Sequence, residues 1–301
     1  MSTIESATNM SELGAAPVRK GVKGTSAGGP SELYLRYQRG KKIDKWLVRL
    51  CQAGLLVAIL VAWEVLARTH IVNPMLTSYP SALWPTFVQL LQTSDIGQQG
   101  NLVDHTLVTL QEVVGSFIVS MALGLLVAVA LWASPFLYRV LDPYIVVSNA
   151  MPKIALVPLF YIWLGAELSI YGIAVAIAGF ITTLMIYAGF RETDPGKIKL
   201  MRALGANKWQ IFTKLVLPGS VPIITSAIKA NIGLVLVGVI VGEFQSSRAG
   251  LGYLIVYGSQ IFKMNLVMTA IMVLAVMSTV MYALVLWLEA AVLRSRRPPA
   301  R

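Results

Sequence analysis

The sequence has few charged residues for its length. Only 13% of its 301 residues are charged and 56% are hydrophobic, whereas a soluble domain carries about 25% charged residues. This composition excludes an ordinary soluble domain. It indicates that the chain is an integral membrane protein whose main solvent is the lipid bilayer.

Residues that perform chemistry are equally scarce. The chain contains one cysteine, Cys51, and two histidines, His70 and His105. A single cysteine excludes an internal disulfide and a cysteine metal site. Two histidines are too few for a zinc site, and no Ser-His-Asp arrangement stands out. The sequence therefore predicts neither a metal centre nor a catalytic site.

A nucleotide-binding loop of the Walker A type is also missing. Gly40-Lys41 and Gly196-Lys197 have neither the upstream glycine nor the following Ser or Thr of that motif. We expect the chain to bind no cofactor. Any energy that the protein uses must then come from an ion gradient or from another protein.

Six apolar stretches are long enough to cross a membrane as helices. A transmembrane helix needs roughly 20 apolar residues, and the alternation typical of β-barrel strands is absent. The fold class is therefore an all-α membrane protein, a polytopic bundle of about six transmembrane helices within residues 46-293. The spans are expected near 47-67, 110-133, 143-164, 168-190, 221-242 and 266-290.

The basic residues predict how the bundle is oriented. Twenty of the 25 Lys and Arg lie in the two tails, in the short loop at Arg139 and in the loop 191-218. The positive-inside rule places these segments, and so both termini, in the cytoplasm. The charges lie at membrane borders and do not form one patch, so the net charge of +11 does not indicate nucleic-acid binding.

The two tails are expected to lie outside the bilayer. Residues 1-45 form a cytoplasmic N-terminal tail, of which 1-30 are rich in Ser, Gly, Ala and Thr and are expected to be disordered. Residues 31-45 mix basic and apolar side chains, which fits either an amphipathic helix on the membrane surface or a solvated basic tail. Residues 294-301 form a basic cytoplasmic tail.

Residues 191-218, called here the charged loop, contain more organised sequence than a hairpin connection needs. They hold six Lys or Arg. Asp194 and Pro195 predict a helix start, with Ile198, Met201 and Leu204 on its apolar face. Gly205 is expected to break this helix.

A second short helix is predicted after the break. Asn207 is a candidate N-cap, Trp209, Phe212 and Val216 share helical spacing, and Pro218 is expected to end the helix. Such a helix pair fits a docking element for a cytoplasmic partner. It also fits a hairpin that packs only against its own bundle.

At four places the chain resembles the permeases of bacterial ABC importers. Gly205, followed after nine residues by Leu215-Val216-Leu217-Pro218, resembles their EAA motif, E-A-A-x(2,3)-G-x(9)-I-x-L-P. Leu204 to Phe212 resembles the LGAS-x-WQ-x-F run of permeases for sulfonates, taurine and nitrate. Pro152 to Phe160 resembles their P-x-x-A-L-x-P-L-F stretch, and Gly242 to Ile255 resembles their E-x(5,6)-GLGYLI segment. The resemblance covers roughly residues 47 to 295.

The resemblance implies the partners and the mechanism. Two permease chains, here expected to be a homodimer in the bacterial cytoplasmic (inner) membrane, form the pathway. Two copies of a separate ABC ATPase hydrolyse ATP, and a periplasmic or extracellular binding protein delivers the substrate. The coupling helices that contact the ATPase would involve Arg202, Ala203, Leu204, Gly205, Ala206, Trp209, Phe212, Leu217 and Pro218.

The chain also departs from the family pattern. Lys199-Leu200-Met201 replaces the E-A-A triplet, so an acidic contact to the ATPase is in doubt. The outer Leu-Pro-Ser-Pro element is only partly present, as Thr77-Ser78-Tyr79-Pro80. We still expect a short outer helix that Pro80 opens.

A few residues are candidates for the pathway or its gate. An intramembrane charge is costly unless it faces a cavity or a partner. Lys153, near Pro158, could attract an anion or be satisfied by free backbone carbonyls. Glu243 could brace the segment through Gly250 and Gly252 and act at a gate. Lys229 is expected to snorkel to the interface, and Glu64 to lie there.

The substrate implied by the family is small, such as a sulfonate, taurine or nitrate, although relatives for pyrimidine or riboflavin-type precursors share the pattern.

Two other classes of membrane protein remain open. A secondary transporter would also be a helix bundle, but internal repeats are expected there and none is clear. A membrane-anchored scaffold would explain the basic tail but would not need the helix pair.

Overall fold

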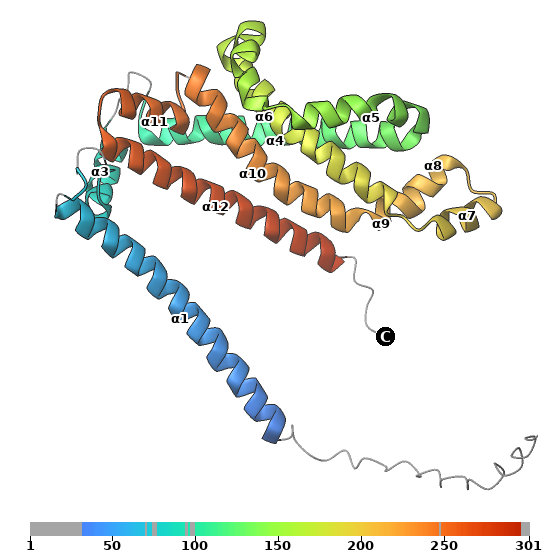
Figure 1. Cartoon of the computed structure of the whole chain (residues 1–301), viewed down its shortest axis with the longest axis horizontal. Helices are drawn as coiled ribbons and strands as arrows, with labels where there is room; N and C mark the ends of the chain where they lie inside the picture. Colours follow the sequence, from blue (N-terminus) through green and yellow to red (C-terminus); the bar gives the residue numbers. More distant parts are fainter. Residues whose placement is uncertain are drawn as a thin grey trace, which may run out of the picture. The chain divides into compact units, whose positions relative to one another are not determined.

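The computed structural model describes residues 32–69, 71–73, 77–93, 96, 100–246 and 248–295. His70, the predicted disordered segment 1-30 and most of the predicted C-terminal tail lie outside these ranges. Within them every regular element is helical, which confirms the all-α prediction (Figure 1).

The helices occur in a simple order along the chain. The elements are α1 (Glu32–Arg68), α3 (Pro80–Gln92), α4 (Leu102–Ala133), α5 (Pro135–Ala150), η1 (Lys153–Leu156), α6 (Val157–Arg191), α7 (Pro195–Ala203), α8 (Lys208–Ile211), η2 (Phe212–Val216), α9 (Leu217–Gly219), α10 (Val221–Ser246), α11 (Leu251–Gln260) and α12 (Met264–Ser295). Among the described residues five helical stretches are long and apolar enough to cross a membrane: Trp46–Arg68, Leu102–Ala133, Lys153–Arg191, Val221–Gln245 and Met264–Trp287.

The predicted spans 143-164 and 168-190 differ from the observed helices. Helix α5 ends at Ala150, because the residue before a proline avoids helical geometry and Pro152 follows Met151. After the short η1 turn, α6 begins with Pro158 in its first turn and runs on to Arg191. The only non-helical residue inside α6 is Gly165, with φ 77°. The break at Gly165 falls between the two predicted spans, and the first of these spans is divided between α5 and the start of α6.

The chain divides into two compact units, Met1–Ile59 and Leu60–Arg301. Within the first unit, the described part of the predicted segment 31-45 belongs to the continuous helix α1. A location on the membrane surface stays a prediction for that segment. The second unit contains the last turns of α1 and all later helices.

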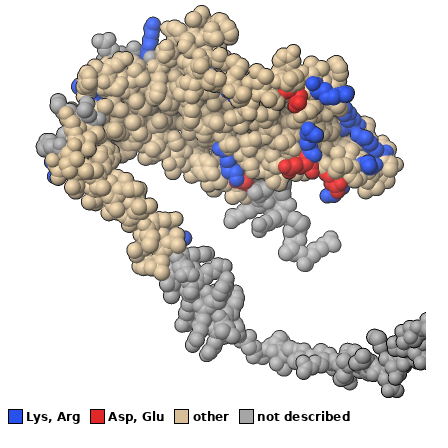
Figure 2. Space-filling view, in the orientation of Figure 1, with Lys and Arg blue, Asp and Glu red and all other residues tan. Residues whose placement is uncertain are grey.

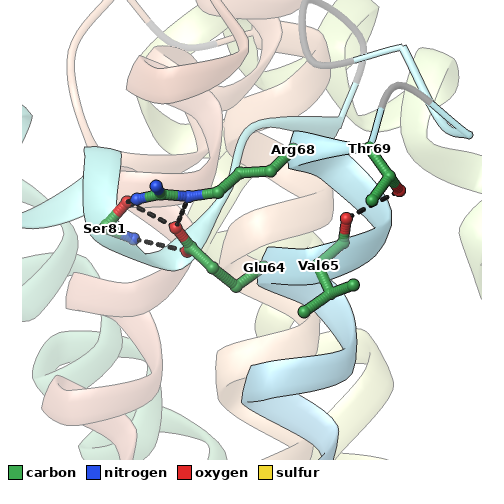
Figure 3. A network of polar contacts seen from close by, with 5 residues as sticks. All are labelled: Glu64, Val65, Arg68, Thr69 and Ser81. Carbon is green, nitrogen blue, oxygen red and sulfur yellow. Dashed lines mark hydrogen bonds and ion pairs between the residues drawn. The ribbon is translucent and has the colours of Figure 1, made fainter.

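Glu64 joins the end of α1 to the start of α3. Its Oε1 atom accepts hydrogen bonds from Arg68 Nε (2.6 Å) and Ser81 Oγ (2.7 Å), and its Oε2 atom accepts one from the Ser81 backbone N–H (3.0 Å) (Figure 3). Helix α3 begins at Pro80, which confirms the predicted outer helix. Proline suits this position because the first helical N–H needs no partner.

Helices α4, α6 and α10 form the centre of the second unit, and α6 packs against both of the others. The backbones of α6 and α10 approach closely at Gly238, where an added Cβ would lie 2.5 Å from the Ala174 Cα. Asn231 on α10 accepts from Ser120 on α4 (3.0 Å) and donates to Thr182 on α6 (2.5 Å). Small residues and polar side chains thus join the three helices, as expected for packing in lipid.

Helices α11 and α12 pack beside this centre with α3. Lys229 of α10 forms an ion pair with Glu289 of α12, with 3.0 Å between Nζ and Oε2. The expectation that Lys229 snorkels to the interface did not include this partner. The pair places the start of α10 next to the end of α12, so the two helices run antiparallel.

We expect Gly238→Ala to destabilise the bundle, because the new Cβ would overlap the Ala174 backbone and force α6 and α10 apart. Overpacking of this kind costs about 1–3 kcal/mol. The measurement is the thermal unfolding midpoint of the purified chain in mild detergent.

Gly233→Ala is the matched control on the same helix, because no atom lies within 4 Å of its added Cβ. Its midpoint should be unchanged or slightly higher, since alanine favours helix. Equal midpoints for the two variants would show that the close approach at Gly238 does not limit stability.

Candidate functional site

The charged loop begins with a capped helix, as predicted. The Asp194 side chain accepts a hydrogen bond from the Gly196 backbone N–H (2.7 Å), and Pro195 occupies the first turn of α7. Helix α7 ends before Gly205, whose φ of +81° is a conformation that favours glycine. The predicted helix start and break are therefore both confirmed.

The second part of the charged loop is more continuous than expected. Asn207 caps α8 in a reciprocal pair with Gln210, with bonds of 2.8 and 2.9 Å. The chain then widens into the π-helix η2 and enters α9 without a stop. Pro218 lies in α9, which ends one residue later at Gly219, so this helical stretch ends before α10 as predicted.

The inner face of the charged loop is packed into the bundle. Phe212 and Val216 are buried, and they cluster with Ile186 and Phe190 of α6 and Ala128 of α4. The Phe212 ring lies 4.8 Å from the Trp132 ring and 5.3 Å from the Phe190 ring, measured between centroids. The Lys208 ammonium also donates to the Ala133 carbonyl at the end of α4. Movement of the charged loop is thus tied to α4 and α6.

The outer face of the charged loop carries large apolar side chains that the described chain leaves exposed. Leu200 is 60% exposed, Leu204 75% and Trp209 63%. Ile198 and Met201 pack against the core as predicted, but Leu204 does not share their face. Helix α7 ends at Ala203, so the helical spacing that would bring Leu204 inward no longer applies.

Positive charge surrounds these apolar side chains. Lys and Arg gather at the end of the molecule that carries α7 and α8, with a few acidic residues nearby (Figure 2). All six basic residues of the charged loop are exposed: Arg191, Lys197, Lys199, Arg202, Lys208 and Lys214. An exposed apolar centre with a charged rim is typical of a protein interface.

A second cluster of polar side chains is buried where α10 meets α11. Glu243 is 1% exposed. Its carboxylate accepts hydrogen bonds from Thr109 Oγ1 (2.7 Å) and from the Gly252 backbone N–H. An added Cβ at Gly250, where φ is +109°, would lie 2.5 Å from the Glu243 carboxyl carbon. Glu243, Gly250 and Gly252 therefore lie together, and the glutamate braces the turn into α11.

Two residues of α4 complete this cluster. His105 Nδ1 accepts a hydrogen bond from the Gly250 N–H (3.0 Å), so the ring proton lies on Nε2, which faces the Ile96 carbonyl at 3.2 Å. The Glu112 carboxyl lies beside that of Glu243, and its Oε2 atom is buried without a hydrogen-bond partner among the described residues.

The sequence reasoning missed Glu112, although a signal was present. His105, Thr109 and Glu112 are spaced at i, i+4 and i+7, which places them on one face of α4. Three polar side chains on one face of a membrane-length helix indicate an internal partner. The predicted span began at residue 110, whereas α4 begins at Leu102 behind the capping box of Asn101 and Asp104.

Lys153 and Pro158 make contacts that do not involve the Glu243 cluster. The Lys153 ammonium lies 5.4 Å from the centroid of the Phe180 ring on α6, a distance suited to a cation–π contact. Pro158 occupies the first turn of α6. The described residues contain no group of three or more His, Cys, Asp or Glu able to hold a metal ion.

Comparison with known proteins identifies the family. The model of the "Binding-protein-dependent transport system inner membrane component" family matches residues 120–295. The chain belongs to this family. The matched segment contains the charged loop and the α10–α11 junction, whereas His105, Thr109 and Glu112 of the second cluster precede it.

Curated relatives cover most of the permease. A probable ABC transporter permease protein of Haemophilus influenzae is 28% identical over 248 residues, covering 80% of this chain and 96% of the relative. The putative aliphatic sulfonates transport permease protein SsuC of Bacillus subtilis is 25% identical and covers 87% and 92%. The riboflavin transport system permease protein RibX of Chloroflexus aurantiacus is 28% identical and covers 79% and 87%.

A solved structure shares the fold of the permease. A chain from the inward-facing MetNI methionine ABC transporter superposes with a TM-score of 0.55 at 20% identity, covering 65% of this chain and 96% of that chain. Membership of the family makes this chain a non-catalytic membrane subunit of an ABC importer. The family also implies an ATPase and a binding protein as partners.

We expect Glu243→Ala to destabilise the permease, because the Thr109 hydroxyl and the Gly252 N–H would lose a buried acceptor. An unsatisfied buried polar group costs about 1–3 kcal/mol. Glu243→Gln keeps one acceptor oxygen and should lose less. Thermal unfolding in detergent measures both variants, and equal midpoints for Glu243→Ala and the parent chain would contradict the bracing role.

Proposed function

We propose that ABC ATPases drive this permease by binding the outer face of the charged loop. The observation that carries the proposal is the exposed set of Leu200, Leu204 and Trp209 within a rim of exposed Lys and Arg. Large apolar side chains of this kind are the anchors of protein interfaces when a partner covers them. The ATPase hydrolyses the ATP, and this chain itself binds no cofactor.

The inner face of the same loop supplies the mechanical link. Because Phe212 packs against Phe190 and Trp132, a displacement of the loop by the ATPase must also displace the ends of α6 and α4. The charged loop and the helix ends can pack in two arrangements, and the pathway can open to a different side of the membrane in each. ATP binding shifts the balance if the ATPase dimer contacts the two arrangements differently.

The contacts between helix ends support a topology in which the end of α12 lies on the same side of the membrane as the charged loop, and the cytoplasmic N-terminus stays a prediction. The Lys208 bond to Ala133 places the end of α4 at the charged loop, and α6 also ends there. The chain from 135 to 191 must therefore leave the loop end and return to it, with the reversal at Gly165. The Lys229–Glu289 pair places the end of α12 on the same side. With the charged loop in the cytoplasm, the positive-inside rule is satisfied.

We further propose that two copies of the chain form the pathway, that two ATPases bind them, and that a binding protein delivers a small anion. The relatives include permeases named for aliphatic sulfonates and taurine, and others named for riboflavin and formylaminopyrimidine. Lys153 supplies a positive charge for the anion, and Pro158 lies in the first turn of α6 beside it. The turn held by Glu243, Gly250 and Gly252 would form part of the gate.

We expect Leu204→Asp to abolish ATPase binding while the chain still inserts in the membrane, because a charge would replace an apolar anchor. The recovery of ATPase with the tagged chain from mild detergent should fall at least tenfold, a loss of about 1.4 kcal/mol or more. Ile71→Asp is the control, since Ile71 is similarly exposed (73%) but lies outside the charged loop.

Two outcomes would contradict the docking proposal. Normal ATPase recovery with Leu204→Asp would exclude the outer face of the loop as the docking site. Absence of any ATPase from the parent chain, even after crosslinking through residues 202-214, would favour a gradient-driven transporter.

We expect Lys153→Glu to lower uptake of an alkanesulfonate by cells that carry the complete transporter, because the reversed charge repels the anion. Lys153→Arg should retain uptake, since the positive charge remains. Uptake is compared at equal membrane levels of the chain. Unchanged uptake in Lys153→Glu would remove this residue from the pathway.

A further inference from the structure

A cavity of about 620 Å³ lies between α5 and the last turns of α6. This volume falls in the range of about 300–1,000 Å³ that is typical of small-molecule sites. The cavity is open on one side, and its walls come from two helices only. It does not share residues with the Glu243 cluster, and Tyr187 on its wall also packs against the apolar cluster around Phe212.

Charged groups of both signs line this cavity. Arg191 and Glu192 come from the end of α6, and Asp142 comes from α5. The ion pairs within 4 Å among the described residues are Arg68–Glu64 and Lys229–Glu289. The three charged side chains of the cavity are thus not paired with one another at contact distance. They remain available to a ligand that carries both charges.

Two tyrosines hold these charges in place. The rings of Tyr138 and Tyr187 stack with 4.8 Å between centroids. The Arg191 guanidinium lies 5.5 Å and 6.0 Å from the same two centroids. On the other side, the Asp142 carboxylate lies beside the Tyr138 hydroxyl. The arrangement orients a cation and an anion toward one space.

The remaining wall is apolar. Ile145 and Val146 from α5 face Leu184 and Ala188 from α6 across the cavity. A charged headgroup alone would leave this wall in contact with water. An aliphatic side chain on the ligand would cover it, and each buried CH₂ group adds to affinity.

We propose that the cavity between α5 and α6 binds a small zwitterion of the amino acid type with an aliphatic side chain. Arg191 binds the ligand carboxylate, for which a guanidinium offers two parallel donors. Asp142 and Glu192 accept from the ligand ammonium group, and the apolar wall takes the side chain.

A ligand in the cavity would contact the start of the charged loop. Arg191 and Glu192 are the first two residues of that loop, and Asp194, the N-cap of α7, follows two residues after Glu192. A bound ligand would link α5 to these two residues and so restrict movement of the charged loop. The site does not depend on how transport is powered, because α5 and α6 alone build it.

The test is equilibrium binding to the purified full chain in lipid nanodiscs, without an ATPase. The probes are L-leucine, 4-methylpentanoate, which lacks only the ammonium group, and 3-methylbutylamine, which lacks only the carboxylate. We expect saturable binding of leucine and at least tenfold weaker binding of both analogues. Equal binding of either analogue, or no saturable binding of leucine, would overturn the proposal whether or not an ATPase docks at the loop.

Variants then locate the site. Arg191→Gln and Asp142→Asn should each weaken leucine binding at least tenfold. Arg139→Gln is the matched control on α5, because Arg139 contacts the Pro135 carbonyl and does not line the cavity. Each variant is first compared with the parent chain in thermal unfolding. Unchanged leucine binding in Arg191→Gln would also overturn the proposal.

Discussion

The close approach of α6 and α10 at Ala174 and Gly238 is the contact on which the bundle depends. Inside a membrane there is no hydrophobic driving force between apolar helices, so contact distance and polar bonds must supply the stability. The bonds of Asn231 to Ser120 and Thr182 add α4 to the same assembly. These three helices then carry both clusters of functional interest at their ends.

Helices α6 and α10 are also the two helices that the charged loop connects. The inner face of the loop packs on Phe190 near the end of α6, and Ser220 before α10 donates to the Gly189 carbonyl. At its other end, α10 carries Glu243, which holds the turn into α11. Helix α10 therefore connects the charged loop, which is the proposed ATPase-docking site, to the proposed gate. In that proposal α10 couples the two sites.

The buried Glu112–Glu243 pair shows how much polarity the bundle tolerates when partners are present. The Glu243 carboxylate accepts from a hydroxyl and a backbone N–H, and the Glu112 carboxyl lies beside it. A charged side chain in a membrane span is costly unless such partners are present. The glycines at 250 and 252 leave room for the carboxylate, because any Cβ there would overlap it. Their small size is therefore a requirement of the glutamate.

The sequence by itself determined the features that depend on near neighbours in the chain. Composition predicted the membrane class. The caps at Asp194 and Asn207, the break at Gly205 and the start of α3 at Pro80 also followed, because each is satisfied by groups within a few residues. Only the tertiary structure decided the Lys229–Glu289 and Glu112–Glu243 pairs and the outward position of Leu204. Each of these depends on which helices become neighbours, and partners 60 or 131 residues apart leave no local pattern in the sequence.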